Sequence, residues 1–349
     1  MLHALKPAAL QVVRLAGGFR MVARSRWRRD RLLILCYHGF ALRDEHLWDP
    51  FLFVSGDHFA RRLDRLRRMG CAVLPLGEAL DLLHRGALPP RAVSLTVDDG
   101  NYDFLAVGMP VLARHGMHAT VYVSTFHVLD QRPVFNVMAS YLLWRAGQNG
   151  RHAVAASTDS PALAVGTREE VFASAAALRD HAAQQQWSAD DKHACLLRLA
   201  EAAGEDWPAL AASRILTLMR PDELRALDAR HADVQLHTHR HRTPRDPALF
   251  RREIEDNRAA LAGAGLAPGG RVHFCYPSGV HHPEFLGWLR EAGVRSATTC
   301  VPGLARADTD PLLLPRFIDT GVTPEVEFEA WCAGVRGLLR RPHRQFTHD

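Results

Sequence analysis

The chain has 349 residues, of which 47% are hydrophobic and 23% are charged, with 25 glycines and 20 prolines. This is the composition of a globular protein, and it excludes a collagen, a disordered tail and a membrane-spanning bundle. The 43 lysines and arginines exceed the 38 aspartates and glutamates by a formal charge of +5. Because the excess is small and almost all of it is arginine, it fits the coding bias of an Ala- and Arg-rich genome better than a nucleic-acid-binding surface.

Residues 1–31 are predicted to form one or two short helices ending in a run of arginines between Arg20 and Arg31. Apolar residues such as Leu10 and Phe19 alternate with basic ones, which suits either an anionic membrane surface or the outside of the folded domain. The first residues do not resemble an export signal, and the six cysteines lack C-x-x-C spacing. We therefore expect free thiols and a cytoplasmic protein, with peripheral contact at the inner membrane face as an option.

From residue 32 onward, short apolar runs alternate with segments of helical period. The runs that predict strands lie at 32–38, 92–97, 119–124, 233–237, 271–276, 295–300 and 311–317. The segments that predict helices lie at 59–70, 110–116, about 247–263 and about 282–293. Strands that alternate with helices predict βαβ units, and hence an α/β fold with a parallel sheet.

Between about residues 135 and 228 the alternation stops, and Ala, Gln and Glu favour helices. The predicted organisation is a basic N-terminal helical segment (1–31), an α/β barrel (32–335) that carries this helical insertion, and a basic C-terminal tail (336–349).

Three polar clusters follow predicted strands, at the ends where an α/β barrel carries its working face. The first contains Asp98, Asp99 and Gly100. Two adjacent carboxylates repel each other unless a cation neutralises one, and Gly100 permits a turn that brings both to one site. By itself the cluster fits an ordinary Asp-Gly turn better than a metal site.

The second cluster contains His237 and His241, four residues apart. In a chain with 20 histidines this spacing alone is weak. Combined with a carboxylate from another strand end, it supplies three ligands and leaves one coordination position open, as in a catalytic zinc-type site. The third cluster, at 274–279, contains Pro277 and Gly279, which predict a tight turn. Its free backbone N–H groups suit a developing oxyanion, although an ordinary turn explains the residues as well.

In this order and spacing, TVDDG at 96–100, HTHRH at 237–241 and FCYPSG at 274–279 resemble the first three signature motifs of the polysaccharide deacetylases, carbohydrate esterase family 4. LCYHGF at 35–40 resembles the opening strand of many members. The resemblance covers about residues 32–330. It implies a distorted (β/α) barrel with fewer than eight units and a divalent-metal-dependent removal of N-acetyl, sometimes O-acetyl, groups from sugars.

The resemblance also implies roles for individual residues. Asp99, His237 and His241 would hold the metal, commonly zinc. Asp98 would be the general base, and the backbone N–H of Tyr276 would share the oxyanion with the metal.

The turn residues Tyr276, Pro277 and Gly279 are expected to bind substrate. His38 is either a buried structural histidine beside the site or a further substrate contact. Thr238, the hydroxyl residue of the second motif, would orient the histidine loop.

The chain departs from the family pattern at two points. The third motif lacks the arginine that pairs with the base, and we expect Arg316, at another strand end, to replace it. The late histidine that serves as general acid has no clear match, which leaves His239, His281 or a metal-assisted water for this role.

The predicted function is the removal of an N-acetyl group from an amino sugar in a polysaccharide, oligosaccharide or glycolipid intermediate. Basic residues at both ends favour a lipid-linked or anionic substrate, and no nucleic-acid partner is expected. The alternatives are an inactive barrel that binds glycan or a protein partner, and an O-acetyl esterase or non-sugar amidase on the same metal site.

Overall fold

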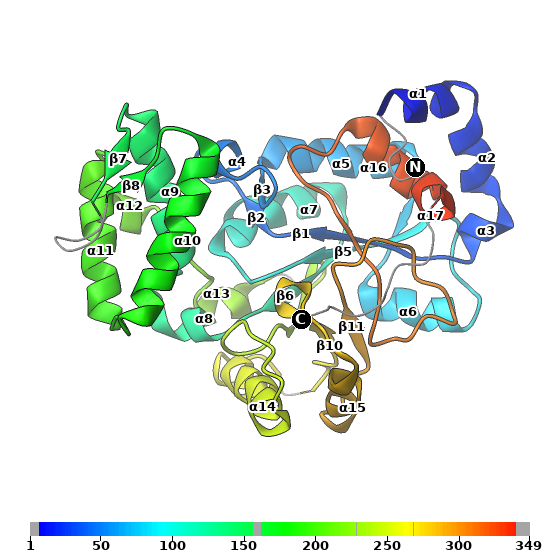
Figure 1. The fold of residues 1–349 in the computed structure, drawn as a ribbon. Helices are drawn as coiled ribbons and strands as arrows, with labels where there is room; N and C mark the ends of the chain where they lie inside the picture. Colours follow the sequence, from blue (N-terminus) through cyan, green and yellow to red (C-terminus); the bar gives the residue numbers. More distant parts are fainter. Residues whose placement is uncertain (1–6, 156–161, 228, 268, 340–349) are drawn as a thin grey trace.

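The computed structural model describes residues 7–155, 162–227, 229–267 and 269–339. Its centre is a curled parallel sheet flanked by helices (Figure 1), so the predicted α/β class is confirmed. The strands of this sheet are β1 (Leu33–Tyr37), β4 (Ala72–Val73), β5 (Ala92–Val97), β6 (Ala119–Val123), β9 (Ala232–Leu236), β10 (His273–Cys275), β11 (Ser296–Thr298) and β12 (Phe317–Ile318). Their order is β11-β10-β9-β6-β5-β1-β12, and β4 pairs with β5.

The central strands show why the sheet is parallel. Every residue of β1, β5 and β6 is buried, as continuous apolar runs require when helices cover both faces. β5 pairs with β6, and β6 pairs with β9, both in parallel. Because parallel strands end at the same edge of the sheet, the residues after β5 and those after β9 meet there.

A single segment near the C-terminus links the two edges of the sheet into a distorted barrel. Leu314 forms a parallel bridge with Thr298 of β11, and three residues later Phe317 pairs with Leu35 of β1. The strand predicted at 311–317 is reduced to these short pairings, since Pro315 cannot donate a hydrogen bond to a neighbouring strand. Pro315 and Arg316 lie between these two pairings, and the side chain of Arg316 is fully buried.

The helices that surround the barrel are α5 (Gly56–Arg68), α6 (Leu76–His84), α7 (Met109–His115), α13 (Pro221–Ala226), α14 (Pro247–Gly263), α15 (Pro283–Glu291) and α16 (Glu325–Ala333), with a π-helix at Phe104–Gly108 directly before α7. Four of them, α5, α7, α14 and α15, match predicted segments, whereas the sequence does not predict α6 and α16, and α13 lies within the bounds predicted for the insertion. In α5, Phe59, Leu63 and Leu66 face the core. The loop after β1 carries β2 (Gly39–Phe40), α4 (Glu45–Trp48) and β3 (Phe53–Val54).

The N-terminal segment forms α1 (Pro7–Leu15), α2 (Gly18–Arg24) and α3 (Arg26–Arg29), which pack beside α16 and α17 (Val335–Leu339) (Figure 1). Leu10 and Phe19 join the apolar cluster beneath them. Arg28 is fully buried and donates hydrogen bonds to the carbonyl oxygens of Cys332 and Ala92 at 3.0 and 3.1 Å. This arginine of the basic run therefore ties the segment to the domain and does not face the surroundings.

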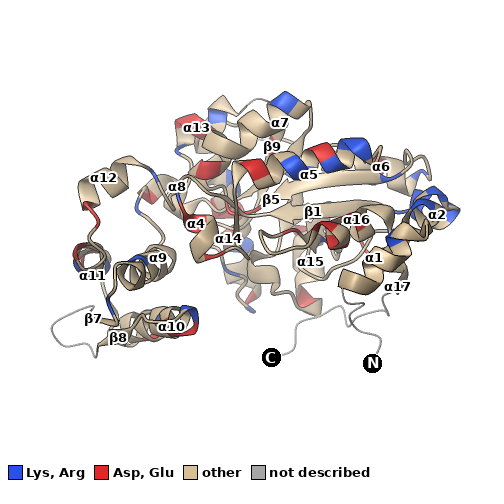
Figure 2. Cartoon of the chain, turned by 90° about the horizontal axis from the view of Figure 1, so that it is seen from above, with Lys and Arg blue, Asp and Glu red and all other residues tan. Residues whose placement is uncertain are grey.

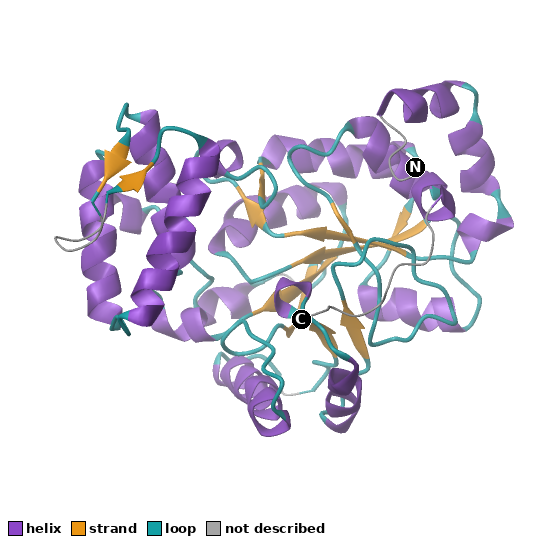
Figure 3. Ribbon diagram, viewed as in Figure 1, coloured by secondary structure: helices purple, strands orange, loops and turns teal. Residues whose placement is uncertain are grey.

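The region predicted as a helical insertion lies at the end of the molecule opposite α1–α3, coloured green in Figure 1. It comprises α9 (Phe135–Gln148), α10 (Arg168–Gln184), α11 (Ala189–Ala202) and α12 (Trp207–Ala212), with an antiparallel pair, β7 (Ala153–Val154) and β8 (Leu163–Ala164), that the sequence does not predict (Figure 3). The short helix α8 (Phe126–Asp130) precedes it at the edge of the barrel. Its helices share an apolar core that includes Leu142, Leu178 and Leu199, and Trp48 and Phe53 of the loop after β1 join it.

Figure 2 shows basic residues along α2 and α5. No helix in the described part of the chain combines the length and the apolar character needed to cross a bilayer. Of the predicted C-terminal tail, residues 340–349 lie outside the described residues.

Candidate metal centre and active site

The turn after β5 places two carboxylates at one end of the barrel. Asp99 has a φ of 73° and Gly100 a φ of 84°, so the backbone leaves the strand geometry that would send Asp98 and Asp99 to opposite faces. A Cβ on Gly100 would lie 2.9 Å from a methyl group of Val123 on β6. Glycine is required here both by its φ and by the close approach of the neighbouring strand.

Asp99, His237 and His241 converge as the sequence predicts. Asp99 Oδ1 lies 3.2 Å from His237 Nε2 and 3.3 Å from His241 Nε2, and the ligand atoms of all three residues are within 4.8 Å of one another. The loop after β9 reaches this geometry with left-handed backbone at Thr238 (φ 61°) and His241 (φ 52°). Such conformations cost on the order of 1–3 kcal/mol each outside glycine, and they concentrate at functional sites.

The hydrogen bond of His237 to the backbone fixes which ring nitrogen faces Asp99. Its Nδ1 lies 2.8 Å from the carbonyl oxygen of Cys275, which can only accept, so Nδ1 carries a proton. Nε2 then faces the Asp99 carboxylate either with a second proton or with a positive ion between them. Burial lowers the pKa of His237, but the carboxylates of Asp99 and Asp98 outweigh it and raise the pKa overall. The set of one carboxylate and two imidazoles matches a catalytic site for a divalent metal.

Asp98 is paired with Arg316 in the barrel interior. The guanidinium donates to both carboxylate oxygens, at 2.7 and 2.8 Å, and a third bond from its Nε reaches the carbonyl oxygen of Thr299 at 3.0 Å. Burial raises the pKa of Asp98, but the charge and hydrogen bonds of Arg316 lower it well below its ordinary value. The predicted pairing of Arg316 with Asp98 is present, and Asp98 stays ionised.

Three further side chains surround Asp98. The thiols of Cys36 and Cys275 lie 3.6 and 3.3 Å from its Oδ2, and His38 Nε2 lies 3.7 Å away. Their atoms form two other groups with metal-ligand spacing. Burial raises the pKa of both thiols well above the ordinary value, so they stay protonated and are poor ligands. The guanidinium of Arg316 would also repel a cation there, which leaves the Asp99 group as the best metal site.

The turn after β10 differs from the expectation for Tyr276. Its backbone N–H donates to the carbonyl oxygen of Thr298 in the neighbouring strand at 3.2 Å, and its buried side chain donates to Leu312 O at 3.1 Å. Tyr276 therefore has no free N–H for an oxyanion and belongs to the core. Pro277 and Gly279 are buried as well.

Ser278 is the exposed residue of this turn, with a φ of 54°. None of the hydrogen bonds within the described ranges uses its N–H. The sequence does not point to Ser278, because a backbone donor has no side-chain signal.

A buried polar network that the sequence analysis also missed holds the histidine loop. Asn257 of α14 accepts from the N–H of His237 at 3.1 Å and donates to Val123 O and Thr125 Oγ1 at 2.9 and 3.0 Å. One turn earlier, Glu253 accepts from the N–H of Arg240 at 2.7 Å. The sequence does contain a signal for this network. Glu253 and Asn257 are polar residues, four apart, on the apolar face of the predicted helix at 247–263.

The two histidines considered as general acids occupy different environments. His281 is buried against the ring of Tyr276, and its Nδ1 lies 2.7 Å from Gly279 O. His239 is half-buried, with Nδ1 2.8 Å from Thr125 Oγ1 and its ring edge-to-face with Phe126. Of the two, His239 is the more accessible.

Comparison with known proteins gives one family and several solved structures of similar fold. The family described as polysaccharide deacetylase matches residues 85–297, more than half of the chain. No curated protein matches the chain in sequence.

Three solved structures illustrate the similarity in fold. The deacetylase PplD of Streptococcus pyogenes in complex with acetate has 17% identity and a TM-score of 0.55, over 85% of this chain and 96% of that one. IcaB from Ammonifex degensii has 20% identity and a TM-score of 0.53, over 87% and 97%. A de-N-acetylase from Aggregatibacter actinomycetemcomitans has 11% identity and a TM-score of 0.52, over 86% and 99%. At these identities the likeness shows the fold alone, which is the predicted distorted barrel.

Proposed function

The chain belongs to the polysaccharide deacetylase family, and on this premise we propose that it is a metal-dependent hydrolase that removes an N-acetyl group from an amino sugar of a polysaccharide, oligosaccharide or glycolipid intermediate. The observation that carries the proposal is the convergence of Asp99, His237 and His241 within 4.8 Å, with Asp98 directly beside them. These residues come from strand ends more than a hundred positions apart, so their meeting is not a local accident of sequence.

Asp99, His237 and His241 would hold the metal, which we propose to be zinc. When bound, such an ion polarises the acetyl carbonyl and lowers the pKa of a water toward about 7. Asp98 accepts the proton of the attacking water. Arg316 keeps this carboxylate ionised and fixed in orientation, at the expense of its strength as a base, so the two residues act as a unit.

We assign the backbone N–H of Ser278 to the developing oxyanion, in place of that of Tyr276. The support is its exposed position in the turn after β10, next to the Cys275 carbonyl that orients His237. A backbone donor fixed in this way stabilises charge in the transition state without rearranging. His38 beside Asp98 remains a proposed substrate contact, and His239 is the proposed acid for the leaving amine.

We place the protein in the cytoplasm, supported by six cysteines that form no disulfide. Peripheral contact with an anionic membrane is supported by α1 and α2, where Val12, Leu15 and Met21 are 66%, 77% and 73% exposed and Arg20 and Arg24 face outward. Apolar side chains flanked by arginines suit the boundary between lipid headgroups and acyl chains.

The membrane contact is tested by sedimentation with vesicles of anionic phospholipid. The protein should pellet with the vesicles, and the triple change Val12→Ser, Leu15→Ser and Met21→Ser should abolish this. Equal amounts of pelleted protein with and without vesicles would refute the contact.

The test of the function is acetate release. N-acetylhexosamine oligomers and lipid-linked N-acetylated sugars are incubated with the metal-loaded protein, with and without a chelator. We expect release that the chelator stops and that Asp99→Ala lacks, while Arg151→Ala, an exposed change far from the histidine loop in sequence, retains it. No release from any N-acetylated sugar would refute the proposal, and release from O-acetylated sugars only would favour an esterase.

A further inference from the structure

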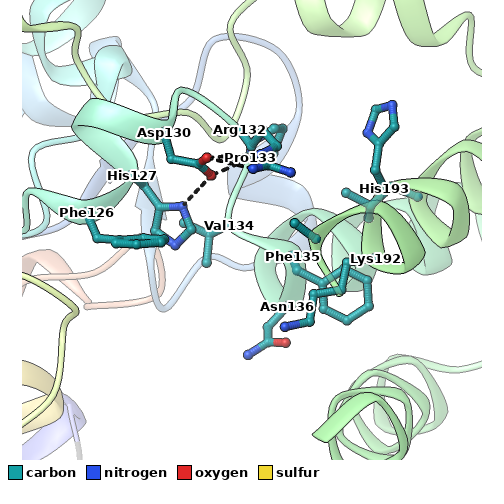
Figure 4. Close-up of a pocket in the computed structure, with 12 residues that line it drawn as sticks. Phe126, His127, Asp130, Arg132, Pro133, Val134, Phe135, Asn136, Lys192 and His193 are labelled. Atoms are coloured by element: carbon teal, nitrogen blue, oxygen red, sulfur yellow. Dashed lines mark hydrogen bonds and ion pairs between the residues drawn. The ribbon is translucent and has the colours of Figure 1, made fainter. Parts of the chain in front are cut away.

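A cavity of about 360 Å³ lies between the segment that joins α8 to α9 and the start of α11. We call it the insertion pocket. Figure 4 shows Phe126, His127 and Asp130 on one side of it, and Asn136 and Lys192 on the other. It therefore opens between the edge of the barrel and the helices of the insertion.

Phe126, which lines the insertion pocket, contacts the loop of the candidate metal centre. The N–H of Phe126 donates to the carbonyl oxygen of His239 at 2.8 Å, and the two rings meet edge-to-face at 5.8 Å. His239 lies in the loop between the proposed ligands His237 and His241. The insertion pocket therefore lies next to the loop that carries both proposed histidine ligands.

Among the charged side chains that line the pocket, the ammonium group of Lys192 has no carboxylate paired with it in the described part of the chain. Asp130 accepts two hydrogen bonds from Arg132, at 3.0 and 3.2 Å, and His127 Nδ1 lies 4.0 Å from the same carboxylate. The charges of Asp130 and Arg132 thus compensate each other. Lys192 is half-buried and takes part in none of the ion pairs formed by the described residues.

An apolar surface adjoins this cation. Phe126 is 43% exposed, and Val134 and Phe135 contribute further apolar lining. An exposed aromatic ring packs against the C–H face of a sugar ring, and a few polar groups in a mostly apolar pocket fix the orientation of a ligand. The combination suits a sugar residue that carries a negative charge.

We propose that the insertion pocket binds an anionic substituent, a phosphate or a carboxylate, on the saccharide whose acetyl group reaches the metal centre. The proposal rests on the proposed function and narrows its substrate class. Lys192 pairs with the anion, and Phe126 packs against the sugar ring that bears it. Both are positioning residues, since neither contacts the reacting carbonyl.

Binding is measured by titration calorimetry on the full-length protein in the presence of a chelator, so that turnover does not consume the ligand. The probes are N-acetylglucosamine, N-acetylglucosamine 1-phosphate, and a disaccharide of N-acetylglucosamine and glucuronic acid. We expect at least one anionic probe to bind more tightly than the neutral sugar, and Lys192→Ala to weaken that probe about tenfold or more. Lys192→Arg should restore most of the affinity, and Arg151→Ala, which removes a charge from the insertion outside the pocket, should change nothing.

Each outcome decides the proposal. Equal affinity for neutral and anionic probes, or an unchanged Kd in Lys192→Ala, overturns it. A phosphate preference identifies a phosphoryl-linked substrate, and a glucuronate preference identifies an acidic glycan. Acetate release without anion preference refutes the pocket and leaves the function standing. Lys192-dependent binding without acetate release from any of the oligomers and lipid-linked sugars refutes the function and leaves the pocket as a binding site.

Discussion

Replacing Arg316 by methionine tests the buried pair at the candidate active site most directly. Methionine is of similar length but uncharged, so Asp98 stays buried and loses two hydrogen bonds of 2.7 and 2.8 Å. Removing one partner of a buried ion pair costs about 3–5 kcal/mol, because the other charge is left uncompensated. We expect the free energy of unfolding at neutral pH to fall by this amount, measured by urea denaturation followed by tryptophan fluorescence.

The same substitution reverses the pH dependence of stability. In the wild type, burial raises the pKa of Asp98 but Arg316 lowers it below the ordinary value. The pair therefore contributes stability that is complete above the unfolded pKa of about 3.9 and is lost as pH falls toward the folded pKa. In Arg316→Met, burial is opposed only by the smaller effects of His38 and His237, so we expect the folded pKa of Asp98 to rise above the unfolded one. Stability should then fall as pH rises between these two values.

Two further variants control this experiment. Asp98→Asn in the Arg316→Met background removes the uncompensated charge and should recover most of the lost stability. Arg306→Met removes a guanidinium from the exposed ion pair with Asp308, where solvent screens the charges. It should have little effect on the free energy of unfolding. If Arg316→Met is as stable as Arg306→Met, or keeps the wild-type slope with pH, the account of the buried pair is wrong.

Three other predictions follow from the metal centre. Asp99→Ala removes one of three ligands and should weaken zinc binding more than about a hundredfold in a chelator competition. Loss of a residue that only hydrogen-bonds to a ligand already lowers metal affinity about 10–100-fold. Asn257→Leu leaves the N–H of His237 without a partner, so we expect a loss of about 1–3 kcal/mol in urea unfolding and about 10–100-fold weaker zinc binding. Gly100→Ala places a methyl group 2.9 Å from Val123 at a φ of 84°, and should destabilise the protein by at least about 1–3 kcal/mol.

The controls for these three variants come from the same chain. Gly150→Ala has a similar φ of 80° but no neighbour within 4 Å, so it should cost less than Gly100→Ala; an equal cost would show that contact with β6 is unimportant. Asn257→Asp keeps one acceptor for the His237 N–H and should retain more metal affinity than Asn257→Leu. Zinc affinity in Asp99→Ala equal to that of the wild type would place the metal elsewhere.

The sequence by itself determined most strands of the main sheet and four of the helices around it, and the family resemblance supplied the three proposed ligands. Continuous apolar runs predict buried parallel strands, and apolar residues at helical spacing, such as Phe59, Leu63 and Leu66, predict the covering helices. These patterns are local, so a linear reading detects them. The order of the three motifs was enough to predict the family and the barrel, and both are confirmed.

Only the tertiary structure decided how distant side chains pair. It brings Arg316 onto Asp98 through the segment that links the two sheet edges. The sequence offered Arg316 as a candidate because it lies at a strand end, but it could not show the contact. It uses the N–H of Tyr276 in strand pairing and exposes Ser278 instead, and it buries Arg28 of the basic run. The physical reason is that hydrogen-bond partners and burial depend on which strands become neighbours, and neighbours in a parallel sheet are separated by whole helices along the chain.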